Sequence, residues 1–69
     1  MNVLINGESR QFPGLTEPLT VALLVAMLGH TGKRIAVERN GEIVPRGSHS
    51  SVELIDGDRI EIVVAVGGG

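Results

Sequence analysis

Helical periodicity occurs only once in this chain, over residues 21–28, and strand-like segments lie before and after it. Thr20 is in position to cap the start of this segment, and Gly29 stands where a C′ glycine ends a helix. The apolar residues at helical spacing on one face are Val21, Leu24, Val25 and Leu28. A single short helix of this kind buries its apolar face against a sheet, which favours the α+β class.

The opposite face of the predicted helix is also apolar, with Ala22, Leu23, Ala26 and Met27. A helix that lies on a sheet buries only one side. Leu23 and Met27 therefore either pack under neighbouring loops or form a contact surface, and the sequence favours neither alternative.

Turn signals divide the rest of the chain into strands. The pairs Asn6, Gly7 and Asn40, Gly41 match the type I′ hairpin turn, which needs positive φ at both central positions. The predicted strands are residues 1–5, 8–12, 35–37, 42–44 and 59–66. The order ββαβββ predicts one α+β domain over residues 1–66, in which the helix packs on one face of a mixed sheet of four to five strands. Residues 46–52 are expected to form a polar loop.

Composition restricts the classes of partner and the compartment. Eight acidic and six basic residues give a net charge of −2 without a run of basic residues, and Phe12 is the only aromatic residue. Nucleic acid is therefore not expected as a partner. The absence of cysteine excludes disulfides and thiolate metal sites and points to the cytoplasm. The first residues lack a basic region and a long apolar stretch, so no signal peptide is expected, and the longest apolar run, residues 21–28, is too short to span a membrane.

No segment carries a convincing catalytic or metal-binding motif. Residues 29–34 resemble a phosphate loop only superficially, because the helix precedes them and an arginine replaces the expected Ser or Thr. His30 and His49 have no ligand partner at helical spacing, so we expect two solvated loop histidines. Asp56 and Asp58 flank a glycine, where turn formation is a better explanation than an acid pair. We therefore predict no catalytic residue, no metal ligand and no bound cofactor, and expect that the chain is not itself an enzyme.

The chain ends on Gly67, Gly68 and Gly69, directly after the last predicted strand. Glycine lacks Cβ and reaches backbone angles closed to other residues, so residues 67–69 are predicted to form a flexible arm that can enter a narrow channel. A frayed terminus is the alternative, because chain ends are usually poorly ordered. With no other reactive group in view, the C-terminal carboxylate is the best candidate site.

Three apolar residues are candidates for a docking face beside this arm. If the first and last strands lie side by side and parallel, then Leu4, Val63 and Ala65 point to the sheet face that the helix does not cover. An exposed apolar patch next to a functional arm is typical of a protein interface, although single surface apolars are common.

Three segments, in order, resemble the ThiS family of sulfur-carrier proteins, which are small ubiquitin-like β-grasp domains of thiamin biosynthesis. The segments are Asn-Gly-Glu-Ile-Val-Pro-Arg at 40–46, Asp-Gly-Asp-Arg-Ile-Glu-Ile at 56–62, and Val-Gly-Gly-Gly at 66–69. The likeness extends over the whole chain and includes the opening strand and the helix start at Thr20. His49 departs from it, because relatives often carry tryptophan there, and so do the apolar Leu23 and Met27.

The resemblance implies that the carboxylate of Gly69 is the working group, with Gly68 and Gly67 giving access to it. A ThiF-like adenylyltransferase would use ATP to form an acyl adenylate on Gly69. Sulfur from a cysteine desulfurase route would then displace AMP and leave a thiocarboxylate. A ThiG-like thiazole synthase would take this sulfur into the thiazole ring.

Three other functions fit the same sequence. A MoaD-like small subunit of molybdopterin synthase has the same fold and tail, but the 40–46 segment and the short length favour ThiS. A ubiquitin-like modifier would pass the activated terminus to a lysine amine. An interaction module with an idle tail would lose nothing on removal of Gly69.

Overall fold

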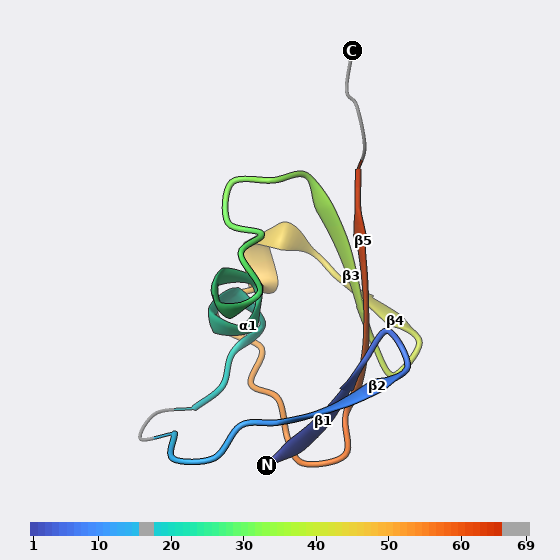
Figure 1. Ribbon diagram of the computed structural model, residues 1–69. Coiled ribbons are helices and arrows are strands. Elements are labelled where there is room, and N and C mark those ends of the chain that lie inside the picture. Colours follow the sequence, from blue (N-terminus) through green and yellow to red (C-terminus); the bar gives the residue numbers. More distant parts are fainter. Residues whose placement is uncertain (16–17, 66–69) are drawn as a thin grey trace.

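Five strands form one mixed sheet in the computed structural model, which describes residues 1–15 and 18–65 (Figure 1). The strands are β1 (Asn2–Ile5), β2 (Glu8–Gln11), β3 (Ile35–Arg39), β4 (Glu42–Val44) and β5 (Arg59–Val64). Their order across the sheet is β2-β1-β5-β3-β4. β1 and β5 are parallel, and the other neighbours are antiparallel. The predicted fold class, element order and parallel pairing of first and last strands are confirmed.

Both hairpins turn at the predicted Asn-Gly pairs. Asn6 and Gly7 have φ of 50° and 82°, and Asn40 and Gly41 have φ of 51° and 87°. These are the left-handed angles that a type I′ turn requires and that Asn and Gly tolerate best.

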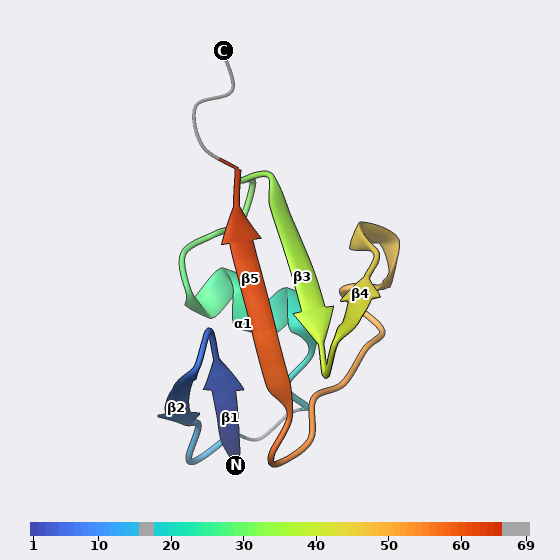
Figure 2. The ribbon, with the colours of Figure 1, turned by 90° about the vertical axis from the view of Figure 1, so that its right-hand side faces the viewer.

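The single helix, α1 (Val21–Met27), lies across one face of the sheet (Figures 1 and 2). The Thr20 hydroxyl accepts a hydrogen bond from the Leu23 N–H at 3.1 Å, which confirms the predicted N-cap. Gly29 follows the helix with φ of 79°, as a C′ glycine does. Leu23 packs against the core, whereas Met27 is 51% exposed.

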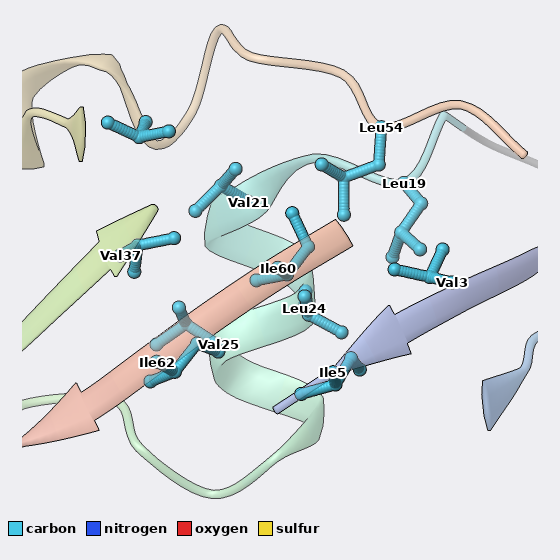
Figure 3. Close-up of a cluster of buried hydrophobic side chains, with 11 residues drawn as sticks. Val3, Ile5, Leu19, Val21, Leu24, Val25, Val37, Leu54, Ile60 and Ile62 are labelled. Carbon is cyan, nitrogen blue, oxygen red and sulfur yellow. The ribbon is translucent and has the colours of Figure 1, made fainter. Parts of the chain in front are cut away.

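The core lies between α1 and the sheet (Figure 3). Alternate residues of β1 and β5 face the helix, and Leu19 and Leu54 close one end of the layer through a 2.8 Å backbone hydrogen bond between them. The most deeply buried side chains are Leu19, Leu24, Ile60, Val3, Val21 and Val37. Full burial of each such side chain stabilises the fold by about 1.5–3 kcal/mol.

The segment 46–52 is not the simple loop that the sequence predicts. It begins with one turn of 3₁₀ helix, η1 (Arg46–Ser48), preceded by Pro45. The Ser48 N–H donates to the Pro45 carbonyl at 2.9 Å. A turn this short has no apolar periodicity, so only its closing hydrogen bonds reveal it. Within the described residues, no helix is long and apolar enough to cross a membrane.

Candidate functional site

The C-terminal strand β5 is the central strand of the sheet and leads directly to the candidate site. It pairs with β3 up to Val64, opposite Ile35, and the Ala65 N–H then donates to the Arg34 carbonyl at 2.9 Å. The sheet therefore holds the chain as far as Ala65. Gly67, Gly68 and Gly69, the predicted arm and modification site, lie outside the described residues, and so does the predicted boundary at residue 66.

The side chain of Asn6 hydrogen-bonds to β5 beyond the point where β1 ends. β1 stops at Ile5, opposite Ile60, so no strand of the described chain flanks the second half of β5 on this side. The Asn6 amide nitrogen donates to the Ile62 carbonyl at 3.2 Å, and its amide oxygen accepts from the Ile62 N–H at 2.8 Å. The Asn6 side-chain amide thus makes the two hydrogen bonds to Ile62 that the backbone of a neighbouring strand would otherwise make. The sequence indicated Asn6 only as a turn residue, because its partner is 56 positions away.

The start of β5 is fixed by a buried carboxylate. Asp58 is only 3% exposed and accepts hydrogen bonds from Arg39 Nε at 2.9 Å, from Asn40 Nδ2 at 3.0 Å and from the Ile55 N–H at 2.9 Å. Burial alone would raise the pKa of Asp58, but these three hydrogen bonds and the Arg39 charge together lower the pKa below its ordinary value. Asp56 instead accepts from the Asn2 N–H at 2.6 Å. The two carboxylates have separate structural partners, so the predicted turn role is confirmed.

The predicted docking residues share one sheet face but do not form one patch. Figure 2 looks onto this face, which α1 leaves uncovered. Val63 is 65% exposed and lies opposite Ala36, and Ala65 is exposed at the end of β5. Leu4 is half-buried and lies opposite Arg59, four residues from Val63 and therefore about 13 Å along the strand. The apolar patch beside the C-terminus consists of Val63, Ala65 and Ala36. Its role as a docking face stays a prediction.

Both histidines lie in loops and are half-buried, so the expectation of two solvated side chains is met only in part. His49 Nε2 lies 3.2 Å from the Val44 carbonyl, which joins the turn after η1 to β4. His30 is half-buried, and its backbone N–H donates to the Val25 carbonyl at 3.0 Å. Across the part of the chain that the structure describes, no three His, Cys, Asp or Glu side chains lie close enough to hold a metal ion.

Lys33 and Arg34 precede β3 beside the end of β5, and the Arg46 side chain reaches the backbone of Lys33, which the lack of a basic run in the sequence did not predict. Arg46 Nη2 donates to the Lys33 carbonyl at 3.4 Å, and the neighbouring Arg34 carbonyl accepts from Ala65. Lys33, Arg34 and Arg46 are all exposed. They come from two loops 13 positions apart, so no local signal could have revealed this grouping.

Comparison with known proteins gives consistent matches that cover most or all of the chain. The model of the ThiS family matches residues 3–69. A thiazole synthase of Paramagnetospirillum magneticum is 46% identical over 69 residues, which cover the full chain but only 20% of that protein. The sulfur carrier protein ThiS of Bacillus subtilis is 46% identical over 50 residues, 72% of this chain and 76% of the relative. The chain therefore spans about a fifth of the length of the thiazole synthases it matches.

A solved structure agrees in fold as well as sequence. The crystal structure of a thiamine biosynthesis protein (ThiS) from Geobacter metallireducens superimposes with a TM-score of 0.83. The two chains are 33% identical, and the match covers all of both.

Proposed function

This chain belongs to the ThiS family, and on that premise we propose that it carries sulfur for thiamin biosynthesis on the carboxylate of Gly69. In this role it is a protein cosubstrate and not a catalyst. The observation that carries the proposal is the family match itself, which extends to residue 69 and so includes all three terminal glycines. The name of the Bacillus subtilis relative, a sulfur carrier, supports the same role.

The chemistry requires a leaving group on the terminal carboxylate, because a free carboxylate is a poor electrophile. A ThiF-like adenylyltransferase would direct a Gly69 oxygen onto the α-phosphorus of ATP, release pyrophosphate and form an acyl adenylate. A persulfide sulfur from a cysteine desulfurase route would attack the acyl carbon, and AMP would leave. The resulting acyl disulfide keeps the S–S bond of the persulfide. A second thiol then cleaves this bond, which leaves the thiocarboxylate on Gly69 and a disulfide between the two thiols. ATP is consumed on the partner, so the carrier needs no cofactor of its own.

The architecture suits a domain that presents its last residues to other proteins. Pairing with β3 on one side and with β1 and Asn6 on the other fixes β5 in the sheet, and the residues after Ala65 continue from this fixed strand. The exposed Val63 and Ala65 lie next to this point. We expect a partner that encloses the last residues to contact this patch first.

We place the thiazole synthase downstream, as the acceptor of sulfur from Gly69. The similarity to thiazole synthases of two organisms supports this order. The cytoplasm is the expected compartment, because the cysteine persulfide route needs thiols that are kept reduced.

The adenylation step can be tested by exchange of labelled pyrophosphate into ATP on the adenylyltransferase. We expect exchange that depends on the full chain and disappears when Gly68 and Gly69 are deleted. Equal melting temperatures for the full and shortened chains would exclude loss of fold as the cause. Because the shortened chain still ends in a carboxylate, on Gly67, equal exchange rates would contradict the assignment of the reactive group to Gly69.

A further inference from the structure

The exposed basic side chains are unevenly distributed over the domain. Of the six basic residues, Arg39 is bound to Asp58, and Arg10 and Arg59 lie on β2 and at the start of β5. Of the other three, Lys33 and Arg34 lie beside the end of β5, where the Arg34 carbonyl accepts from Ala65, and Arg46 donates to the Lys33 carbonyl; we name these three residues the basic rim. A chain with a net charge of −2 therefore carries three basic residues close to the end of β5.

The basic rim is not needed to neutralise charge within the described part of the chain. The one ion pair among the described residues joins Arg39 to Asp58, where a buried carboxylate needs a cation. The side chains of Lys33 and Arg34 make no hydrogen bond to a described residue, and Arg46 reaches only the Lys33 carbonyl. Apart from this one bond, the described residues do not engage the guanidinium and ammonium donors, which are suited to bind an external acceptor.

A small cleft is lined by Lys33 and Arg46, two of the three residues of the basic rim. It has a volume of about 180 Å³ and an apolar floor that includes Val25 and Ile35, with Lys33, Arg46 and His49 in its lining. Pockets for small molecules usually begin at about 300 Å³, so this cleft is suited to a single side chain. An acidic side chain from another protein would place its carboxylate among the cations and its methylenes on the apolar floor.

The position of the basic rim beside the end of β5 indicates which kind of partner would contact it. Any protein that encloses the residues after Ala65 must approach past Lys33, Arg34 and the Val63 patch, because Arg34 is bound to Ala65 through the backbone. Complementary charge at an interface speeds association and fixes orientation more than it raises affinity. Nucleic acid is a poor alternative, because binding proteins commonly make about 6–10 phosphate contacts and the rim has three cations.

We propose that the basic rim docks onto an acidic surface of the protein that encloses the C-terminus. In the proposed function this protein is the adenylyltransferase, and the inference rests on that assignment. The rim and the Val63 patch then form one bipartite surface, in which charge guides the approach and apolar contact completes it.

The test compares two double charge reversals in the full chain. Lys33→Glu with Arg34→Glu alters the rim, and Arg10→Glu with Arg59→Glu is the matched control, with the same change of net charge on exposed side chains far from the rim. Association with the adenylyltransferase is measured without ATP, at about 0.02 M and 0.5 M salt. We expect the rim variant to associate about tenfold or more slowly at low salt, with the difference mostly lost at high salt. The control should stay within about twofold of the parent chain at both salt concentrations.

Equal slowing of both variants would show an effect of net charge alone, and unchanged association of the rim variant would overturn the proposal. Failure of the parent chain to bind would also overturn it. A second titration with a single-stranded oligonucleotide separates the sources of anion. If the oligonucleotide binds the parent chain but not the rim variant, while protein association is unchanged, the rim is a polyanion site and the proposal is wrong. Association without ATP and adenylation are measured in separate assays. If the parent chain associates but is not adenylated, the proposed function is contradicted, whereas the proposal for the basic rim is not.

Discussion

The buried carboxylate of Asp58 gives the sharpest prediction about stability. Substitution Asp58→Ala removes the acceptor of two part-buried hydrogen bonds, from the Ile55 N–H and the Asn40 side-chain amide, and leaving such a donor unsatisfied costs up to about 1–3 kcal/mol. Water can partly replace the lost partner of Arg39, because that side chain is 31% exposed. We therefore expect the free energy of unfolding to fall by about 3 kcal/mol. This is a large part of the roughly 3–10 kcal/mol available to a domain of this size.

The pH dependence of the free energy of unfolding tests whether the ionised carboxylate of Asp58 is the source of this stabilisation. The folded-state pKa of Asp58 is lowered, so its contribution is fully present above the unfolded-state pKa, about pH 4, and is lost as pH falls through the lower folded-state value. Asp58→Asn removes the negative charge and the titrating group. We expect the free energy of unfolding to fall by about 1–2 kcal/mol between pH 5 and 7. The difference from the parent chain should then shrink below about pH 4.

Urea unfolding followed by far-UV circular dichroism is the suitable assay, because Phe12 is the only aromatic residue and fluorescence is weak. Asp56→Asn is the matched control, since Asp56 is an exposed carboxylate of the same turn with one backbone partner. It should cost less than about 1 kcal/mol. Equal costs for the two substitutions, or a difference for Asp58→Asn that is constant down to pH 2.5, would refute this account of the Asp58 network.

Three further substitutions test other parts of the structure. Asn6→Ala should lower the free energy of unfolding by about 2 kcal/mol, because the two hydrogen bonds of the Asn6 side chain to Ile62 are lost. Urea unfolding measures this change, and an unchanged free energy of unfolding would contradict the role of Asn6. Leu24→Ala should cost about 2–5 kcal/mol by opening a cavity in the core, and a smaller shift in thermal unfolding would mean that the helix is loosely packed. Val63→Asp should leave the melting temperature unchanged within error but weaken association with the adenylyltransferase at least about tenfold, or about 1.4 kcal/mol. Unchanged association would remove Val63 from the docking face.

Local signals were sufficient to predict the helix and the five strands, although not the 3₁₀ turn η1. The Asn-Gly turns at residues 6–7 and 40–41, and the cap at Thr20, depend on backbone angles and hydrogen bonds within a few residues. The parallel pairing of β1 with β5 followed from the order of elements. The prediction could not give their register, and for this reason it placed Leu4 with Val63 although the two lie at opposite ends of β5.

Features that depend on distant residues were not predictable. The Asn6 clamp, the Arg39 and Asp58 pair and the basic rim each join positions between 13 and 56 residues apart. Burial of Asp58 also reverses the usual expectation that an aspartate in a turn is solvated. The proposed reactive group was identified differently, from the glycine ending and from the likeness to a family, and it does not depend on the geometry of the sheet.

The central claim is that Gly69 becomes a thiocarboxylate, and intact-mass measurement tests it most directly. The full chain is incubated with ATP, the adenylyltransferase and a cysteine persulfide donor, and the C-terminal peptide is then sequenced by fragmentation. We predict a mass gain equal to the replacement of one oxygen by one sulfur, located on Gly69 and absent without ATP. An unchanged mass, under conditions in which the ThiS protein of Bacillus subtilis gains sulfur with its own partners, would contradict the assignment.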